Sequence, residues 1–252
     1  MWQWFAVGLQ AKLPCRLYFF TGVGNRTRII DIAKVSSALG TNVCSALIGI
    51  HTFSGCNSTS AFHGKGKQKT FSVACEKEYL TAFTELGSSF TLDQSTFDGL
   101  SRYVCHLYGQ PSARSVNDAR YRAFCMASSA LPELSMPPTS DALYQHCKRA
   151  NYQAAIMRHS LQAVMCAPTP VGNGWHVEDG ELTVTWMTRN PAPDSVLQVV
   201  HCGCKLGKCE TGRCSCLSAK LSCTDLCLCQ NCLNVSKETE DRVTWVMGWW
   251  LR

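Results

Sequence analysis

Residues 201–232 have the sequence HCGCKLGKCETGRCSCLSAKLSCTDLCLCQNC, and this stretch holds nine of the 17 cysteines of the chain. Their spacing is C-x-C-x4-C-x4-C-x-C-x6-C-x3-C-x-C-x2-C. Proteins bind zinc with four ligands in a tetrahedron, and closely spaced cysteine pairs are typical of such sites. We therefore predict that the nine cysteines are metal ligands. They are Cys202, Cys204, Cys209, Cys214, Cys216, Cys223, Cys227, Cys229 and Cys232.

The number of cysteines sharpens this prediction. Two separate four-thiolate sites would leave one of the nine thiols over, whereas three zinc ions need twelve ligand positions. Nine cysteines fill those positions if three of them each bridge two metals. We therefore expect about three zinc ions, bridged by thiolates. A disulfide-linked knot is the alternative, but the odd number of cysteines and the scattered single cysteines upstream favour metal.

Composition limits the class of protein. The chain has 252 residues, of which 46% are hydrophobic and 17% charged, and this is typical of a folded globular protein. No apolar run is long enough to predict a membrane span. The start, MWQWFAVGLQAKLPC, lacks the features of a secretory signal peptide. Reduced thiols with zinc indicate the nucleus or, alternatively, the cytoplasm.

The net charge of +6 is unevenly distributed, because residues 12–70 alone carry +7. A basic segment and a weakly basic cysteine stretch are compatible with a polyanion partner such as DNA at two places, although a solvated basic face is equally compatible. Nine thiolates and three Zn²⁺ together carry −3, so DNA contacts must come from basic side chains gathered on one face. The candidates near the cysteines are Lys205, Lys208, Arg213 and Lys220, and a second candidate pair is Lys65 and Lys67.

Hydrophobic periodicity predicts a mostly helical protein with a few short strands, followed by a small module with little regular secondary structure. A short buried strand is expected over 13–21 and another over 26–30, and residues 51–71 are expected to form a loop. Helices are expected over 32–39, capped by Asp31, and over 42–50, capped by Thr41. Further predicted elements are two helices within 72–108, the second capped by Thr91 or Asp93, a helix from Ser115, a helix over 140–164 and a strand over 181–187.

Punctuation by proline and glycine suggests the division into domains. The proposed boundaries are a helical domain over 12–131, a long helix and strand connection over 139–200, the cysteine module over 201–234 and a tail over 235–252. The tail, which contains VTWVMGWWLR, is apolar and aromatic, and three interpretations are open: packing on the chain, binding of a partner, or an artefact of the gene model.

The cysteine stretch resembles the CXC domain of the tesmin family, in which cysteine triplets surround a trinuclear zinc cluster and the domain binds DNA. All nine ligand positions match, with one extra residue between Cys223 and Cys227. In that family a tyrosine just before the fourth cysteine enters the minor groove, and here that position is Arg213. An arginine also enters narrow minor grooves, so the resemblance implies DNA binding with an altered sequence preference. This chain has one such domain where tesmin-like proteins usually have two, which implies weaker binding.

Residues 47–67, LIGIHTFSGCNSTSAFHGKGK, resemble a segment of transposon-associated animal proteins that pair a domain similar to PIN and flap nucleases with a CXC module. Stretches at 117–125, 140–158 and 180–187 resemble the same group. The resemblance implies a metal-binding aspartate where this chain has Asn57, and an upstream acidic motif that this sequence lacks. Before residue 76 the only carboxylate is Asp31.

Because two-metal hydrolysis needs several carboxylates, we expect a truncated nuclease-like domain without activity. A divalent-metal-dependent nuclease remnant, or a zinc-stabilised protein-interaction module, are the alternatives.

Overall fold

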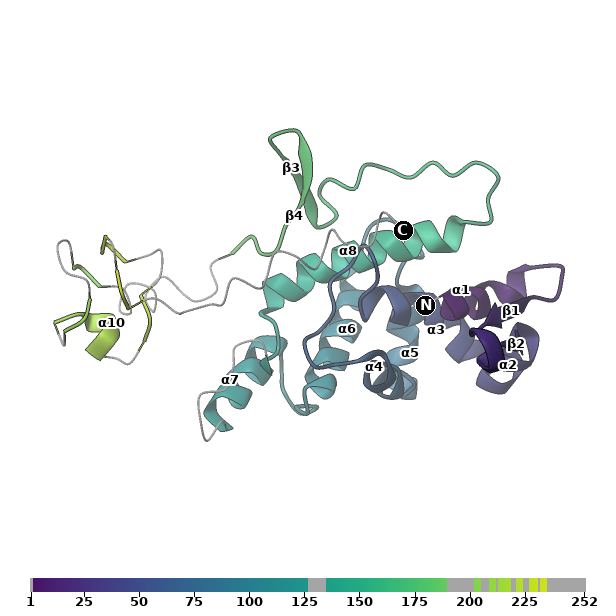
Figure 1. Ribbon diagram of the computed structural model, residues 1–252, viewed down its shortest axis with the longest axis horizontal. Helices are drawn as coiled ribbons and strands as arrows, with labels where there is room; N and C mark the ends of the chain where they lie inside the picture. The colour runs from purple at the N-terminus through teal and green to yellow at the C-terminus, as the bar shows by residue number, and fades with distance from the viewer. Residues whose placement is uncertain are drawn as a thin grey trace. The chain divides into compact units, whose positions relative to one another are not determined.

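Helices dominate the structure, a computed structural model that describes residues 2–126, 135–189, 202–204, 209–211, 213–218, 221–223, 227–230 and 232–234. Residues 1–189 and residues 190–252 form two units, which are considered separately below. The helices of the first unit are α1 (Trp2–Leu9), α2 (Ile32–Leu39), α3 (Thr41–Phe53), α4 (Lys67–Ala74), α5 (Lys77–Glu85), α6 (Gln94–Leu107), α7 (Val116–Met126) and α8 (Ser140–His159) (Figure 1).

The strands form two antiparallel hairpins. One pairs β1 (Tyr18–Thr21) with β2 (Arg28–Asp31), and the other pairs β3 (Trp175–Glu178) with β4 (Glu181–Val184). In the second unit the described residues contain one helical turn, α10 (Ser215–Ser218). The predicted fold class, mostly helical with a few short strands and a cysteine module with little regular structure, is confirmed.

Several helix starts lie where the capping residues predict them. The Asp31 carboxylate accepts hydrogen bonds from the N–H groups of Ala33 and Lys34 at 3.1 and 3.3 Å, so α2 begins directly after it. Asp93 caps α6 through the N–H of Thr96 at 2.9 Å. Each of these bonds satisfies an N–H group that has no partner within its helix.

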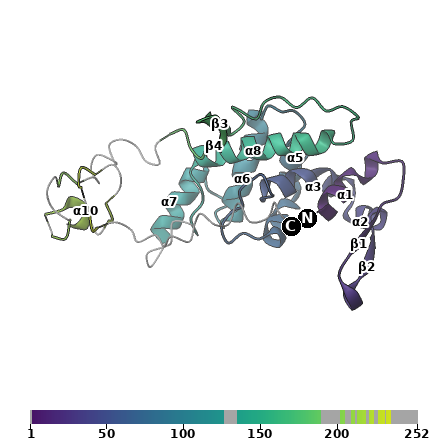
Figure 2. The same cartoon turned by 45° about the horizontal axis from the view of Figure 1, so that its top comes forward.

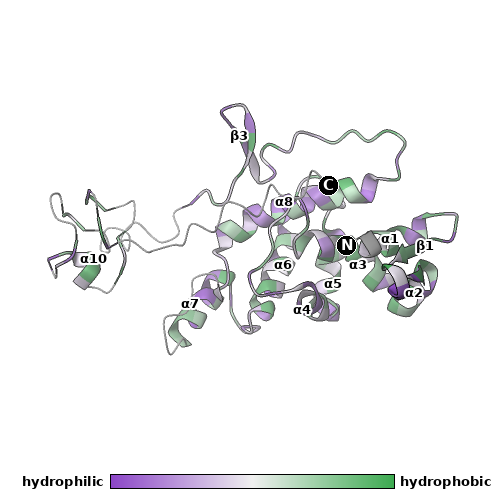
Figure 3. Cartoon of the chain, viewed as in Figure 1, coloured by the Kyte–Doolittle hydropathy of each residue, from purple (hydrophilic) through white to green (hydrophobic). Residues whose placement is uncertain are grey.

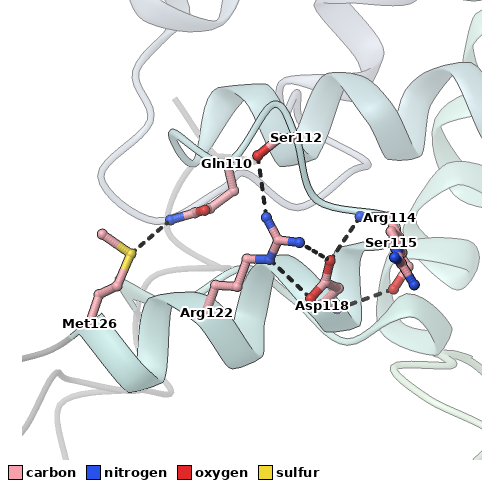
Figure 4. A network of polar contacts seen from close by, with 7 residues as sticks. All are labelled: Gln110, Ser112, Arg114, Ser115, Asp118, Arg122 and Met126. Carbon is pink, nitrogen blue, oxygen red and sulfur yellow. Dashed lines mark hydrogen bonds and ion pairs between the residues drawn. The ribbon is translucent and has the colours of Figure 1, made fainter.

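The start of α7 carries a polar network (Figure 4). Ser115 Oγ accepts from the N–H of Asp118 at 3.1 Å, while the Asp118 carboxylate accepts from the N–H of Arg114 at 2.9 Å. Asp118 also pairs with Arg122 one turn later, at 2.9 Å. The prediction that Ser115 begins a helix is therefore confirmed, and an i,i+4 ion pair adds to the cap.

Other expectations differ from the structure. The segment 51–71 is not wholly a loop, because α3 continues through His51 to Phe53 and α4 begins at Lys67. The helix expected before Gly87 is two helices, since Glu76 is extended and separates α4 from α5. Thr41 is the first helical residue of α3, and Gly40 occupies the cap position. The N-terminal helix α1 and the strand β3 were not expected.

The long helix α8 ends at His159, five residues earlier than predicted. Leu161 and Val164, which the predicted helix included, follow its observed end and are 45% and 79% exposed. The strand over 13–21 is also shorter than expected, and Tyr18 and Phe20 are exposed where a buried strand was predicted. Of the predicted domain boundaries, the one near 131 falls on residues outside the described part of the chain, as does the whole tail over 235–252.

Helix α8 is buried on most of its circumference, although it carries many polar side chains (Figure 3). Arg149, only 2% exposed, donates to the carbonyl oxygens of Gly174 and Thr185 at 3.2 and 2.7 Å. Asn151 bonds the N–H of Gly87 at 2.8 Å. Main-chain partners thus satisfy these buried groups, and their bonds hold the β3–β4 hairpin and the end of α5 against α8.

Arg158 of α8 contacts the C-terminal end of α5. Its guanidinium donates to the carbonyl oxygens of Leu86 at 2.9 Å and Phe83 at 3.2 Å. Carbonyl groups at a helix end lack partners within the helix, and a cation there also favours the helix dipole. Arg158 therefore stabilises the end of α5 and joins it to α8.

No single described helix has the length and apolar character needed to cross a membrane. Together α2 and α3 meet the length and composition criteria, but they meet at a bend of 106°.

We expect Gly49→Ala to destabilise the first unit by about 1 to 3 kcal/mol, because a Cβ at this position would overlap the carbonyl oxygen of Phe83 where α3 crosses α5. The matched control is Gly66→Ala, since Gly66 has φ −66° and nothing within 4 Å of an added Cβ. Thermal unfolding followed by helical circular dichroism measures both. Equal melting temperatures for the two variants would contradict the close approach of α3 and α5.

We expect the buried imidazole of His146 to make the first unit less stable in mild acid. Nε2 donates to the carbonyl oxygen of Phe53 at 2.8 Å and Nδ1 accepts from Ser60 Oγ at 2.9 Å, while burial lowers the pKa of His146 to about 4. Below pH 6.5 the unfolded chain takes up a proton that the folded chain refuses, so stability falls as the pH drops from 6.5 toward 4.

Urea unfolding at pH 7 and pH 5 measures this effect. The loss of stability between the two pH values should be about 2 kcal/mol smaller in His146→Gln than in the wild type. His51, whose pKa burial also lowers to about 4, remains in the variant and contributes equally to both proteins. The same pH dependence in both proteins would show that His146 is not held neutral.

Candidate metal centre

Cysteines form the interior of the second unit. Cys202, Cys209, Cys214, Cys216 and Cys223 are at most 7% exposed, and the other four cysteines of the stretch pack against them. Leu217 is the one other hydrophobic side chain in this cluster among the described residues. All nine cysteines are free thiols. Among the described residues, the core of the module is therefore made mainly of sulfur.

Main-chain hydrogen bonds between distant parts of the stretch bring the cysteines together. The N–H of Leu228 donates to the carbonyl oxygen of Cys202 at 3.0 Å. This bond joins the segment that holds Cys227 and Cys229 to the start of the stretch. The N–H of Cys223 donates to the carbonyl oxygen of Asn234. Cys209 has a φ of 57°, and this left-handed conformation turns the chain between Cys204, which precedes it, and Cys214, which follows it.

The thiols form three overlapping groups of four. In each group the four sulfur atoms lie within 4.8 Å of one another. The first group is Cys202, Cys216, Cys223 and Cys227; the second is Cys202, Cys209, Cys214 and Cys223; the third is Cys209, Cys223, Cys229 and Cys232. Eight cysteines thus supply twelve positions, because Cys202 and Cys209 each belong to two groups and Cys223 belongs to all three.

The distances between sulfur atoms fit tetrahedral coordination. Cys202 lies 3.8 Å from Cys209 and from Cys223, and Cys216 lies 3.6 Å from Cys227. A metal–sulfur bond of about 2.3 Å gives a tetrahedron with an edge of about 3.8 Å. A disulfide bond is far shorter, at about 2.05 Å. The arrangement can therefore hold metal ions.

Cys204 belongs to none of the three groups. Its thiol nevertheless interacts with the thiols of Cys202 and Cys209, and it lies close enough to Cys214 for an electrostatic interaction. Burial, followed by the hydrogen bond to Cys202, raises the pKa of Cys204. Cys204 thus lies beside three members of the second group.

Crowding makes most of these thiols reluctant to ionise. Burial raises the pKa of Cys209 and Cys223 strongly, that of Cys216 to about 12 and that of Cys229 to about 11. A divalent cation reverses this preference, because it binds the thiolate and stabilises its charge. A metal that binds at this site would therefore release protons, and its binding would weaken as the pH falls.

Cys214 differs from its neighbours. The N–H of Leu217 donates to its sulfur at 3.4 Å, and this bond above all lowers the pKa of Cys214 to about 7. The Asn234 side chain similarly donates to the sulfur of Cys223 at 3.4 Å. The sequence analysis did not identify either donor, because neither the Leu217 main chain nor Asn234 forms part of the cysteine spacing.

The predicted basic contacts fall in different places. Arg213 is exposed and directly precedes Cys214, whereas Lys205, Lys208 and Lys220 lie outside the described residues. Lys65 and Lys67 belong to the first unit. The Lys65 ammonium lies 4.5 Å from the centre of the Tyr108 ring, and burial lowers its pKa.

The Lys67 ammonium is hydrogen-bonded to the end of α3 and to the loop that follows α3. Its ammonium donates to the carbonyl oxygen of His51 and to Ser54 Oγ, both at 2.8 Å, and to the carbonyl oxygen of Gly55. Burial lowers the pKa of Lys67 to about 8. An ammonium has three N–H donors, so Lys67 fastens the loop after α3 and has no donor left for a phosphate.

Asn57, which stands at the position of the aspartate implied by the nuclease resemblance, is exposed. Within the described residues, the one group of potential metal ligands outside the cysteine module is Glu76, Glu78 and His106, which does not include Asn57. His106 Nδ1 lies 3.4 Å from the Glu76 carboxylate and 3.1 Å from the Tyr79 hydroxyl.

Comparison with known proteins adds no relative: no family model matches the chain, and neither a curated protein nor a solved structure is significantly similar to it.

Proposed function

We propose that residues 201–234 bind three zinc ions through nine thiolates and that this zinc module binds DNA. The observation that carries the proposal is the set of three overlapping thiol groups, each with the size of one tetrahedral site. Tetrahedral four-thiolate coordination is typical of zinc. The resemblance to tesmin-type CXC domains supports the same metal and the same partner.

The overlap of the groups also suggests which thiolates bridge. If Cys204 replaces Cys223 in the second group, each pair of groups shares one sulfur: Cys202, Cys209 or Cys223. These three cysteines then bridge two zinc ions each. The remaining six bind one ion each, in the pairs Cys204 with Cys214, Cys216 with Cys227, and Cys229 with Cys232.

This assignment uses all nine cysteines and supplies four ligands to each of three ions. It agrees with the expectation from the number of cysteines, which required three bridging thiolates but did not identify them.

Arg213 is the described residue best placed to contact DNA. It is exposed, and it directly precedes Cys214. An arginine inserted into a narrow minor groove interacts with the negative potential there. Because three zinc ions do not neutralise nine thiolates, the attraction to phosphate must come from Arg213 and its basic neighbours, and affinity should be modest and strongly salt-dependent. This function places the protein in the nucleus.

We further propose that the first unit has no nuclease activity. Asn57 is a weaker ligand for Mg²⁺ than a carboxylate, and two-metal hydrolysis depends on several carboxylates around the ions.

We expect elemental analysis of the reduced, purified protein to find about three zinc ions per chain. Cys223→Ser should lose more than one zinc ion, because Cys223 bridges two ions in this assignment. Cys204→Ser should lose at most one. Cys15→Ser, which changes an exposed cysteine outside the module, is the control and should keep all three. Two ions or fewer in the wild type, or equal losses from the Cys223 and Cys204 variants, would overturn the bridging assignment.

We expect Arg213→Ala to weaken binding to duplex DNA and to reduce the slope of log affinity against log salt by about one, as for the loss of one phosphate contact. Arg213→Lys should keep the salt slope but lose affinity for A·T-rich duplexes, because a lysine retains only the charge. Gel-shift titrations at several salt concentrations measure both variants, with zinc content as the control for folding. Wild-type protein that binds no DNA at low salt would favour the protein-interaction alternative.

A further inference from the structure

The hairpin β1–β2 has two different faces. Its register pairs Phe19 with Ile30 and Phe20 with Ile29, so successive residues point to opposite sides. Phe19 and Ile30 pack against a cluster that contains Ile32 of α2 and buried residues of α1 and α3. This inner face fixes the hairpin to the first unit.

The outer face exposes large apolar side chains. Tyr18 is 58% exposed, Phe20 67% and Ile29 66%, and Val23 in the connecting turn is 87% exposed. Single exposed apolar residues are common on protein surfaces, but a contiguous set on one face indicates a binding surface. Figure 2 shows β1 and β2 extending beyond α2, away from the other helices.

The charged side chains around this face are mostly basic. Lys12, Arg16, Arg26 and Arg28 are all exposed, and residues 12–30 contain no carboxylate. The first acidic side chain is Asp31, which caps α2 through hydrogen bonds to two N–H groups. A partner that complements this surface is therefore negatively charged and also offers apolar faces.

Single-stranded nucleic acid has both properties. Its phosphates suit the arginines, and its unpaired bases stack on aromatic rings without regard to sequence. Tyr18 and Phe20 are alternate residues on one strand, so their rings start about 6.8 Å apart along it and can take successive bases. In a duplex the base faces are stacked on each other and are not available to these rings.

We propose that the outer face of the β1–β2 hairpin binds single-stranded nucleic acid, with Tyr18 and Phe20 stacking on bases and Arg16 and Arg26, which lie before β1 and in the connecting turn, contacting phosphates. The site is independent of the zinc module, because it lies wholly within the first unit. It is a different site from the predicted pair Lys65 and Lys67, whose ammonium groups contact Tyr108 and the loop after α3.

The test uses the full-length, zinc-loaded protein and fluorescence anisotropy with labelled oligothymidylate, oligouridylate of the same length, and a duplex of the DNA strand. Phe20→Leu should weaken binding to the single strands about tenfold without changing the salt slope, because it removes the stacking ring but keeps an apolar side chain. Phe20→Trp should restore binding. Arg26→Gln, which changes an exposed arginine in the connecting turn, should reduce the salt slope.

Phe124→Leu is the matched control, since Phe124 is 65% exposed on α7, outside the hairpin, and should bind as the wild type does. Circular dichroism of each variant checks folding. Affinities for oligothymidylate and oligouridylate then distinguish DNA from RNA as the preferred strand.

Arg213→Ala separates this site from the zinc module. The variant should bind duplex DNA more weakly and keep single-strand binding, so the two proposals can fail independently. Unchanged single-strand binding in Phe20→Leu would overturn the inference. Loss of single-strand binding in Arg213→Ala would also overturn it. Equal weakening of duplex and single-strand binding by Phe20→Leu would also overturn it, because base stacking requires unpaired bases.

Discussion

The constraint on which the second unit depends is that sulfur fills its interior. Burial of hydrocarbon side chains stabilises a fold because they leave water. A small thiol contributes less in this way than a large apolar side chain, and a buried thiolate is costly without a cation. Burial accordingly raises the pKa of Cys209 and Cys223. A cation that binds the thiolates would supply the missing free energy, so folding of this unit and metal binding would be one process.

The first unit is organised on the opposite principle. Its core is hydrocarbon, centred on residues such as Phe53, Phe83 and Leu100, none of which is exposed. Several of its buried polar side chains bond main-chain atoms, as Arg149 does with the carbonyl oxygens of Gly174 and Thr185. Nothing in this core requires a metal. Removal of metal would therefore affect the two units differently, and a nucleic-acid surface on the first unit would not depend on the metal state of the second.

Local interactions were predictable from the sequence and distant ones were not. Asp31, Asp93, Ser115 and Thr139 cap the helices that follow them, because a cap needs only a neighbouring N–H group. The role of Lys67 was missed, since its partners are His51, Ser54 and Gly55, which the chain brings close only by folding back. The exposure of Phe20 was missed for a related reason: the sequence shows an apolar run but not which face a helix covers.

The metal site shows the same limit of prediction from sequence. Spacing and number predicted all nine cysteines, and stoichiometry required bridging, since three tetrahedra need more ligands than nine separate thiols provide. Spacing alone did not identify the bridging thiols, because a bridging sulfur must lie between two ions that different parts of the chain surround. Cys223 belongs to all three thiol groups. Its N–H donates to the carbonyl oxygen of Asn234, so the end of the described stretch lies beside Cys223. If the module holds three ions, the main-chain bonds among the described residues of 202–234 decide which thiols are shared, and the number of cysteines decides how many must be.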